Sequence, residues 1–391
     1  MASSISNRLR KNIRLFSTWF IPLIIISKIV RWTIMYDRLV MTSMGHGMVI
    51  AINKGGHEFI MNFVDHSSNI FLGIPEQNTI AFCENINVFD ISTYLGWEIF
   101  FTLFFNILIW KTMRNFYKSN LNVDKLSNTF IYLSIIVLNI FCLNLAKEPY
   151  QLIFWFLIMY AIIRPSGLKK KYIFLFIALT VTIMLSRKYY ALTAIFFIFI
   201  RIIMNFMLNA NTSHNSGIRL FYKVIITIIF VGGLFYVSIL FMNMYGMSEV
   251  YELLAYANSM DRNNGEVDSM IVPLFGTASP ILMTLENIVK VFRLMFPLEL
   301  LIKPKATYLV LIVYQILLCR LLFKAIKNRT KNTYEKNFAL DLYLAFLCTS
   351  AAFEPDFGSW LRHESVTFPI LLYLIPSDFN KRKKYRNNYD S

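Results

Sequence analysis

The segment from Glu354 to Glu364, EPDFGSWLRHE, gathers ionisable side chains between two apolar stretches near the end of the chain. His363 titrates near neutral pH and could remove a proton from a hydroxyl group. Glu354 and Asp356 could do the same, or they could orient the neighbouring arginine. Arg362 carries a planar fork of donors that suits phosphate oxygens. The segment therefore combines candidates for proton transfer with a candidate for anion binding.

Two other short segments also carry charges between apolar stretches. LAKEPYQ contains Lys147 and Glu148, and LSRKYYA contains Arg187 and Tyr190. Arg187 and Arg362 could together bind a pyrophosphate, with Lys147 and Tyr190 as further ligands and Glu148 as a third candidate acid. A transferase that uses a lipid-pyrophosphate donor needs such stabilisation of departing negative charge. The alternative is that these charges only solvate helix ends or contact lipid head groups.

The elements that must position these residues are apolar helices. Of the 391 residues, 56% are hydrophobic and only 16% are charged, and the mean hydropathy is +0.51. Soluble domains carry about 25% charged residues. A soluble protein of this composition would expose too much apolar surface. The sequence therefore predicts an all-α, polytopic integral membrane protein.

A helix that crosses a bilayer needs about 20 mostly apolar residues. About ten segments approach this requirement, at roughly 13–33, 92–110, 128–146, 150–164, 171–186, 189–208, 222–244, 306–323, 338–353 and 365–379. We expect residues 1–391 to form one membrane domain with extracytoplasmic loops at about 37–91 and 245–305. Lys28 and Arg31 stand where a signal-peptide cleavage site would fall, so we expect the first span to be retained.

Most Lys and Arg residues lie in alternate loops and in the basic tail, 380–391, which predicts that both termini are cytoplasmic. The three charged segments then lie on the extracytoplasmic side. Basic inner loops that face anionic lipid also account for the net charge of +16. We therefore expect no nucleic-acid partner, because no aromatic and basic binding platform is present. The Cys and His spacings match no metal site, so we expect no metal or other cofactor.

The segment SPILMTLENIVKVFRLMFP in the late loop has a helical hydrophobic pattern. Its polar and apolar residues separate onto two faces: Glu286, Asn287, Lys290 and Arg293 against Leu282, Leu285, Ile288, Val289 and Phe292. This pattern predicts an amphipathic helix that lies at the outer membrane surface. The alternative is an ordinary helix packed inside a loop domain.

These features together resemble the Wzy-type membrane polymerases of bacterial capsule, O-antigen and exopolysaccharide repeat units. In that family KE or KD follows an early span, RxYY lies in a mid-chain outer turn, and DxGSxxRH…P precedes the last span. This chain has LAKEPYQ, LSRKYYA and EPDFGSWLRHE…FP in the same order. It departs from the family at RKYY, because a proline after the arginine is common there.

The resemblance implies a glycosyltransferase in the bacterial plasma membrane. Its lipid-linked substrate would be an oligosaccharide on a polyprenyl pyrophosphate, transferred at the outer leaflet to another carrier-linked repeat unit. Arg187 and Arg362 would bind the pyrophosphate, and His363 or an acid would activate the acceptor hydroxyl. Membrane lipids, a flippase and a chain-length regulator would be its partners.

Three other classes of function remain open. A polyprenyl-phosphate-sugar-dependent glycosyltransferase usually has an acidic pair early in its first outer loop, where this chain has only Asp37 beside Arg38. A non-catalytic oligosaccharide transporter or flippase should carry charges at mid-bilayer depth, and Arg201 is the main candidate. An O-acyltransferase should have a membrane-embedded His–Asp pair, and none stands out in the sequence.

Overall fold

The computed structural model describes residues 2–34, 87–91, 94–119, 123–144, 147–163, 167–185, 190–209, 229–237, 239–240, 269–275, 279–302, 305–354 and 356–375. Within these ranges nearly every residue is helical, and the one β pairing is an isolated bridge between Met270 and Asp356. The all-α prediction is therefore confirmed. Most of the predicted loop at about 37–91 lies outside the described residues, as do residues 245–268 of the predicted loop at about 245–305 and the tail at 380–391.

Four helices of the described chain are long and apolar enough to cross a membrane: Asn12–Thr33, Leu95–Lys118, Lys125–Cys142 and Tyr308–Lys327. They coincide with the first, second, third and eighth predicted spans. Shorter apolar helices, Glu148–Ile163 and Tyr190–Asn205, lie at the fourth and sixth. The helices agree with a multi-pass membrane protein, and the total of about ten spans stays a prediction.

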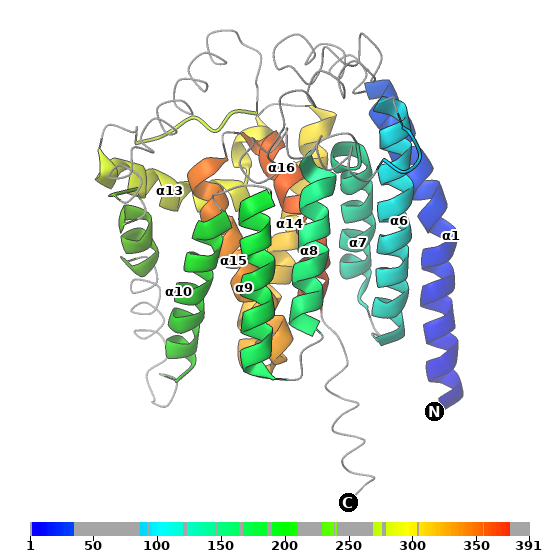
Figure 1. Ribbon diagram of the computed structural model, residues 1–391, viewed down its shortest axis with the longest axis horizontal. Helices are drawn as coiled ribbons and strands as arrows, with labels where there is room; N and C mark the ends of the chain where they lie inside the picture. The colour runs from blue at the N-terminus through cyan, green and yellow to red at the C-terminus, as the bar shows by residue number, and fades with distance from the viewer. Residues whose placement is uncertain are drawn as a thin grey trace, which may run out of the picture. The chain divides into compact units, whose positions relative to one another are not determined.

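The chain divides into two compact units, and the first comprises Met1–Lys188 and Glu364–Ser391. Its described elements are α1 (Ala2–Ile34), α6 (Tyr94–Ser119), α7 (Lys125–Val137), the π-helix η2 (Leu138–Cys142), α8 (Lys147–Ile163), α9 (Leu168–Leu185), α17 (Phe368–Leu371) and η5 (Leu372–Leu374). Helices α1, α6 and α7 lie side by side (Figure 1), while α8 packs against α9 and α17.

Two cations near the end of α1 have partners inside the first unit. Lys28 Nζ donates to Glu98 Oε1 at 2.8 Å and to the Leu143 carbonyl at 2.7 Å. Arg31 donates to the same Glu98 oxygen at 2.9 Å and to the Ile140 carbonyl at 2.6 Å. A helix end leaves carbonyl groups without intrahelical donors, and the end of η2 offers such groups here. These contacts offset the cost of burying the two charges among apolar helices.

The second unit comprises Tyr189–His363. Its described elements are α10 (Tyr190–Asn209), the helical segment 229–237, α13 (Pro280–Met295), η3 (Leu298–Leu301), α14 (Ala306–Lys327), η4 (Arg329–Lys331), α15 (Tyr334–Phe353) and α16 (Phe357–Ser365), which runs two residues into the first unit. Helix α15 is buried along most of its length and packs against α10, α13 and α14. Helix α13 lies across the direction of α10 and α15 (Figure 1).

The predicted tenth span, about 365–379, is not a single helix over its described part. Helix α16 ends at Ser365, a turn follows, and α17 begins at Phe368 before the short helix η5. Pro369 lies in the first turn of α17. Proline has no N–H, and its ring clashes with the carbonyl four residues earlier, so α16 cannot continue through this position.

Helix α13 has the predicted amphipathic pattern, with its polar face directed into the unit. Glu286 and Arg293 are 6% and 9% exposed, whereas Leu285 and Phe292 are 43% and 58% exposed. A helix inside a soluble loop domain would bury its apolar face instead. The apolar face is thus exposed, and the location of α13 at the outer membrane surface stays a prediction.

Candidate functional site

Glu354 and His363 form a buried acid–histidine pair in the second unit. Glu354 follows the last residue of α15 in an extended conformation, and its N–H donates to the Ser350 carbonyl. His363 lies on α16, and its Nδ1 is 2.5 Å from Glu354 Oε1. Each side chain is only 1% exposed. With Glu354 ionised, the carboxylate can only accept, so Nδ1 donates and Nε2 is left as the basic nitrogen.

Ser359 lies one turn before His363 on the same helix, with its Oγ 3.4 Å from His363 Nδ1. Residues four apart share one face of a helix, so α16 sets this contact by its own geometry. Both contacts are made at Nδ1, so the carboxylate and the hydroxyl hold the same edge of the imidazole. This fixed orientation is what a general base needs.

Asp356 has a structural task at the start of α16. Its Oδ1 accepts from the Ser359 N–H at 2.8 Å, which is the contact of a helix N-cap. A Cβ at Gly358 would approach the same oxygen to 3.0 Å, so glycine leaves room for the cap. The Phe357 N–H donates to the Ser269 carbonyl at 3.0 Å and ties this corner to segment 269–275. These contacts fit a capping role, and the catalytic role stays a prediction.

Glu354, Asp356 and His363 form a charged cluster, to which Lys290 also belongs. The sequence placed Lys290 only on the polar face of α13. Desolvation by burial lowers its pKa to about 8, and the nearby charges of Glu354, Glu286 and Asp356 oppose that shift. The charges of Glu354 and Asp356 therefore act on Lys290, which relates α13 to this part of the site. Its position four residues after Glu286 was the available sequence signal, but the partner Glu354 is far away in the chain.

Arg293 is held by contacts that stabilise the unit. It makes a two-point pair with Glu299, at 2.5 and 2.9 Å, and donates to Glu286 at 3.2 Å and to the Val272 carbonyl at 2.7 Å. Glu286 also accepts from the N–H groups of residues 274 and 275. Arg293 therefore links α13 to η3 and to segment 269–275.

Two of the predicted pyrophosphate ligands also lie in the second unit. Arg362 is half-buried on α16, directly before His363. Tyr190 is the first residue of α10, is buried, and stacks on Phe346 with ring centroids 6.2 Å apart. The ring of Tyr190 thus packs in the core, and its part in anion binding stays a prediction.

The remaining predicted residues lie in the first unit or outside the described residues. Glu148 lies in the first turn of α8, in the first unit, and is buried. Lys147 begins the same helix, but its side chain lies outside the described residues, as does Arg187 altogether. The convergence of the three charged segments therefore stays a prediction.

His, Cys, Asp and Glu side chains can also act as metal ligands. Across the described ranges, no three His, Cys, Asp or Glu side chains gather closely enough to hold a metal ion. Cys142 lies instead beside Ser365, with Sγ 3.0 Å from Oγ.

Comparisons of the chain with protein-family models, with curated proteins and with solved structures found no match. The fold and the site define a coarse class: an all-α protein with helices long and apolar enough to cross a membrane, and with a buried acid–histidine pair.

Proposed function

We propose that this protein is a membrane glycosyltransferase that polymerises oligosaccharide repeat units carried on polyprenyl pyrophosphate. The contact of His363 Nδ1 with Glu354 Oε1 carries the proposal, because it leaves Nε2 as an oriented base for an acceptor hydroxyl. The resemblance of the three charged segments to Wzy-type polymerases supports the same activity. The proposal includes about ten spans, two cytoplasmic termini and a reaction at the outer leaflet of the bacterial plasma membrane.

In the proposed reaction, the acceptor sugar oxygen forms a bond to the anomeric carbon of the donor glycan. The bond from that carbon to the pyrophosphate oxygen breaks, and polyprenyl pyrophosphate leaves with the bonding electrons. His363 takes the acceptor proton. Arg362 and Lys290 offset the charge that develops on the leaving group, and Arg187 and Lys147 are proposed to join them.

His363 is covered in the free protein, so the acceptor has to displace neighbouring side chains to reach Nε2. Arg362 is partly accessible on the same helix and gives the anionic group a first point of contact. Shielding of the acid–histidine pair from water strengthens its electrostatic coupling. Because Arg362 is accessible and His363 is covered, we propose that the pyrophosphate binds before proton transfer.

The test uses the purified full-length protein in lipid with a polyprenyl-pyrophosphate repeat unit as the only glycan. Wild type should produce a ladder of longer glycans, whereas His363→Gln, Arg362→Ala and Arg187→Ala should leave single units. Lys327→Ala removes an exposed cation at the end of α14 and serves as the control. Normal ladders from the His363 and Arg362 variants would refute the site, and no ladder from wild type would refute the activity.

A further inference from the structure

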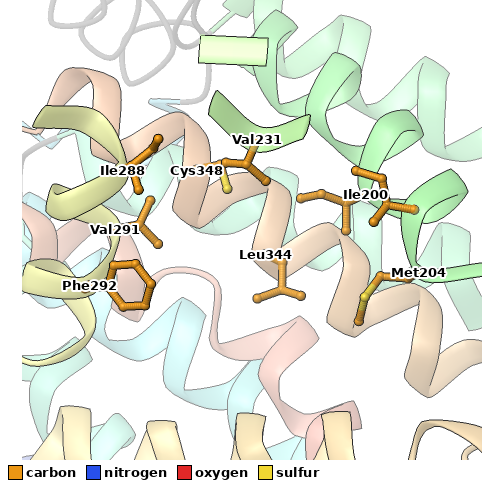
Figure 2. Close-up of a pocket in the computed structure, with 9 residues that line it drawn as sticks. Ile200, Met204, Val231, Ile288, Val291, Phe292, Leu344 and Cys348 are labelled. Atoms are coloured by element: carbon orange, nitrogen blue, oxygen red, sulfur yellow. The ribbon is translucent and has the colours of Figure 1, made fainter. Parts of the chain in front are cut away.

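An apolar groove lies in the second unit, beside α13. Its volume is about 200 Å³, and its lining side chains are hydrocarbons except for the sulfur-containing Met204 and Cys348. Ile200 and Met204 come from α10, Val231 from segment 229–237, Ile288 and Phe292 from α13, and Leu344 from α15. These side chains point toward a common space in Figure 2. A space with this lining favours hydrocarbon over water.

The groove and the charged cluster share one helix. Ile288 and Phe292 line the groove, while Lys290 lies between them in sequence and interacts electrostatically with Glu354 and Asp356. Successive side chains of a helix point in different directions, so α13 separates an apolar side from a charged side. A ligand with a hydrocarbon chain and an anionic head group matches both sides.

The surface beside the groove consists of exposed apolar side chains. Phe292, at the rim, is 58% exposed, and Ile281, Leu285, Phe296 and Leu298 are exposed large apolar residues of α13 and the segment after it. An exposed apolar patch of this kind marks a contact with membrane or with a partner. A ligand would therefore reach the groove from the lipid phase.

Gly232 lies where segment 229–237 faces α13. A Cβ at this position would lie 3.2 Å from Ile288 Cδ1, which is tighter than ordinary van der Waals contact. Glycine thus lets the segment approach closely and brings Val231 to the groove wall. The groove, at about 200 Å³, has room for part of one hydrocarbon chain.

We infer that the groove binds the hydrocarbon chain of the polyprenyl carrier, with the phosphate groups directed toward Lys290 and Arg362. The inference rests on the proposed function and assigns a site for the part of the substrate that does not react. Chain binding would hold the anomeric carbon near His363, so that remote binding energy assists the transfer step. The inference also explains why α13 directs its polar face inward.

The experiment measures chain binding directly, without sugar transfer. The full-length protein in vesicles of phosphatidylethanolamine and phosphatidylglycerol is exposed to a polyprenyl monophosphate with a photoreactive group in its chain. Peptides that contain Val231 and Ile288 should be labelled, and excess unlabelled polyprenyl monophosphate should reduce this labelling at least tenfold. Added phosphatidylglycerol should not.

Two variants with matched controls locate the site. Val231→Trp should fill the groove and lower labelling at least fivefold, whereas Val237→Trp alters an exposed position on the same segment and should not. Phe292→Ala at the rim should lower labelling, and Phe296→Ala should not. The rim pair keeps the test decisive if Val231→Trp fails to fold.

The possible outcomes test the groove and the proposed polymerase activity separately. Equal labelling of wild type and both groove variants, or equal competition by phosphatidylglycerol, would overturn the inference. Labelling as expected from a protein that makes no glycan ladder would retain the groove and refute the polymerase. A glycan ladder from a protein that is not labelled in the groove would retain the enzyme and refute the groove.

Discussion

Glu354 and His363 face each other across the break between α15 and α16, with Oε1 2.5 Å from Nδ1. The break places the carboxylate where an uninterrupted helix could not, because residues nine apart do not share one helical turn. Asp356 caps the first turn of α16 and so fixes the direction of the helix that carries the histidine. The pair is therefore built by a helix end, a short extended corner and a capped helix start.

Glu354→Gln should lower the rate of polymerisation about 10²–10⁴-fold with little change in KM. The amide keeps the size of the side chain but removes the charge that stabilises a protonated imidazole. Initial rates of ladder formation at several substrate concentrations provide the measurement. Glu335→Gln, in the first turn of α15, is the control and should retain activity. An unchanged rate in Glu354→Gln would exclude the acid–histidine pair from catalysis.

Activity should fall as the pH rises through about 8, where Lys290 loses its proton. Only the protonated amine attracts a pyrophosphate, so the active fraction is high below this pKa and decreases above it. Lys290→Arg keeps the charge at every accessible pH and should move this decline to higher pH. Lys290→Met should weaken substrate binding below about pH 8 and remove this decline. Identical pH profiles for wild type and Lys290→Arg would show that Lys290 does not act on the anion.

The hydrophobic pattern was sufficient to predict the four long apolar helices, because the apolar character of a span is a local property of the sequence. The partners of the buried charges were not predictable in this way. Lys28 and Glu98 are 70 residues apart, and Arg201 and Asp341 are 140 apart. Such pairs depend on which helices pack together, and no local pattern encodes that choice.

The candidate site shows the same division. Glu354 and His363 were both recognised in the sequence as chemically suitable residues, but only the structure shows that they form a hydrogen bond. The amphipathic pattern of α13 was visible in the sequence, whereas the inward direction of its polar face was not. Pro369, by contrast, was a readable signal against one continuous helix at 365–379.

Asp356→Asn should retain both stability and activity, because asparagine caps a helix as well as aspartate does. Asp356→Ala should lower the free energy of unfolding by about 1 kcal/mol through loss of the cap. Thermal unfolding in detergent and ladder formation are measured on the same preparations. If Asp356→Asn abolishes the ladder while the protein remains folded, the carboxylate has a catalytic role beyond capping.

Asp341→Ala should destabilise the second unit by about 3–5 kcal/mol. Asp341 is buried in α15 and accepts from Arg201 at 2.6 Å and from Arg329 at 2.5 and 2.9 Å. Arg201 also lies over the Tyr334 ring, 4.6 Å from its centroid. Removing the carboxylate would leave two buried cations without their common acceptor, which costs more than the pair itself contributes.

Chemical or thermal unfolding of the Asp341 variant provides the measurement, with Glu335→Gln on the same helix as the control. The contacts of Arg201 fit a structural role and leave it poorly placed as the mobile charge of a transporter. Normal stability of the Asp341→Ala protein would contradict the structural role of Arg201 and Asp341. Transport of the lipid-linked glycan that depends on Arg201 in a folded protein would then favour a flippase over the polymerase.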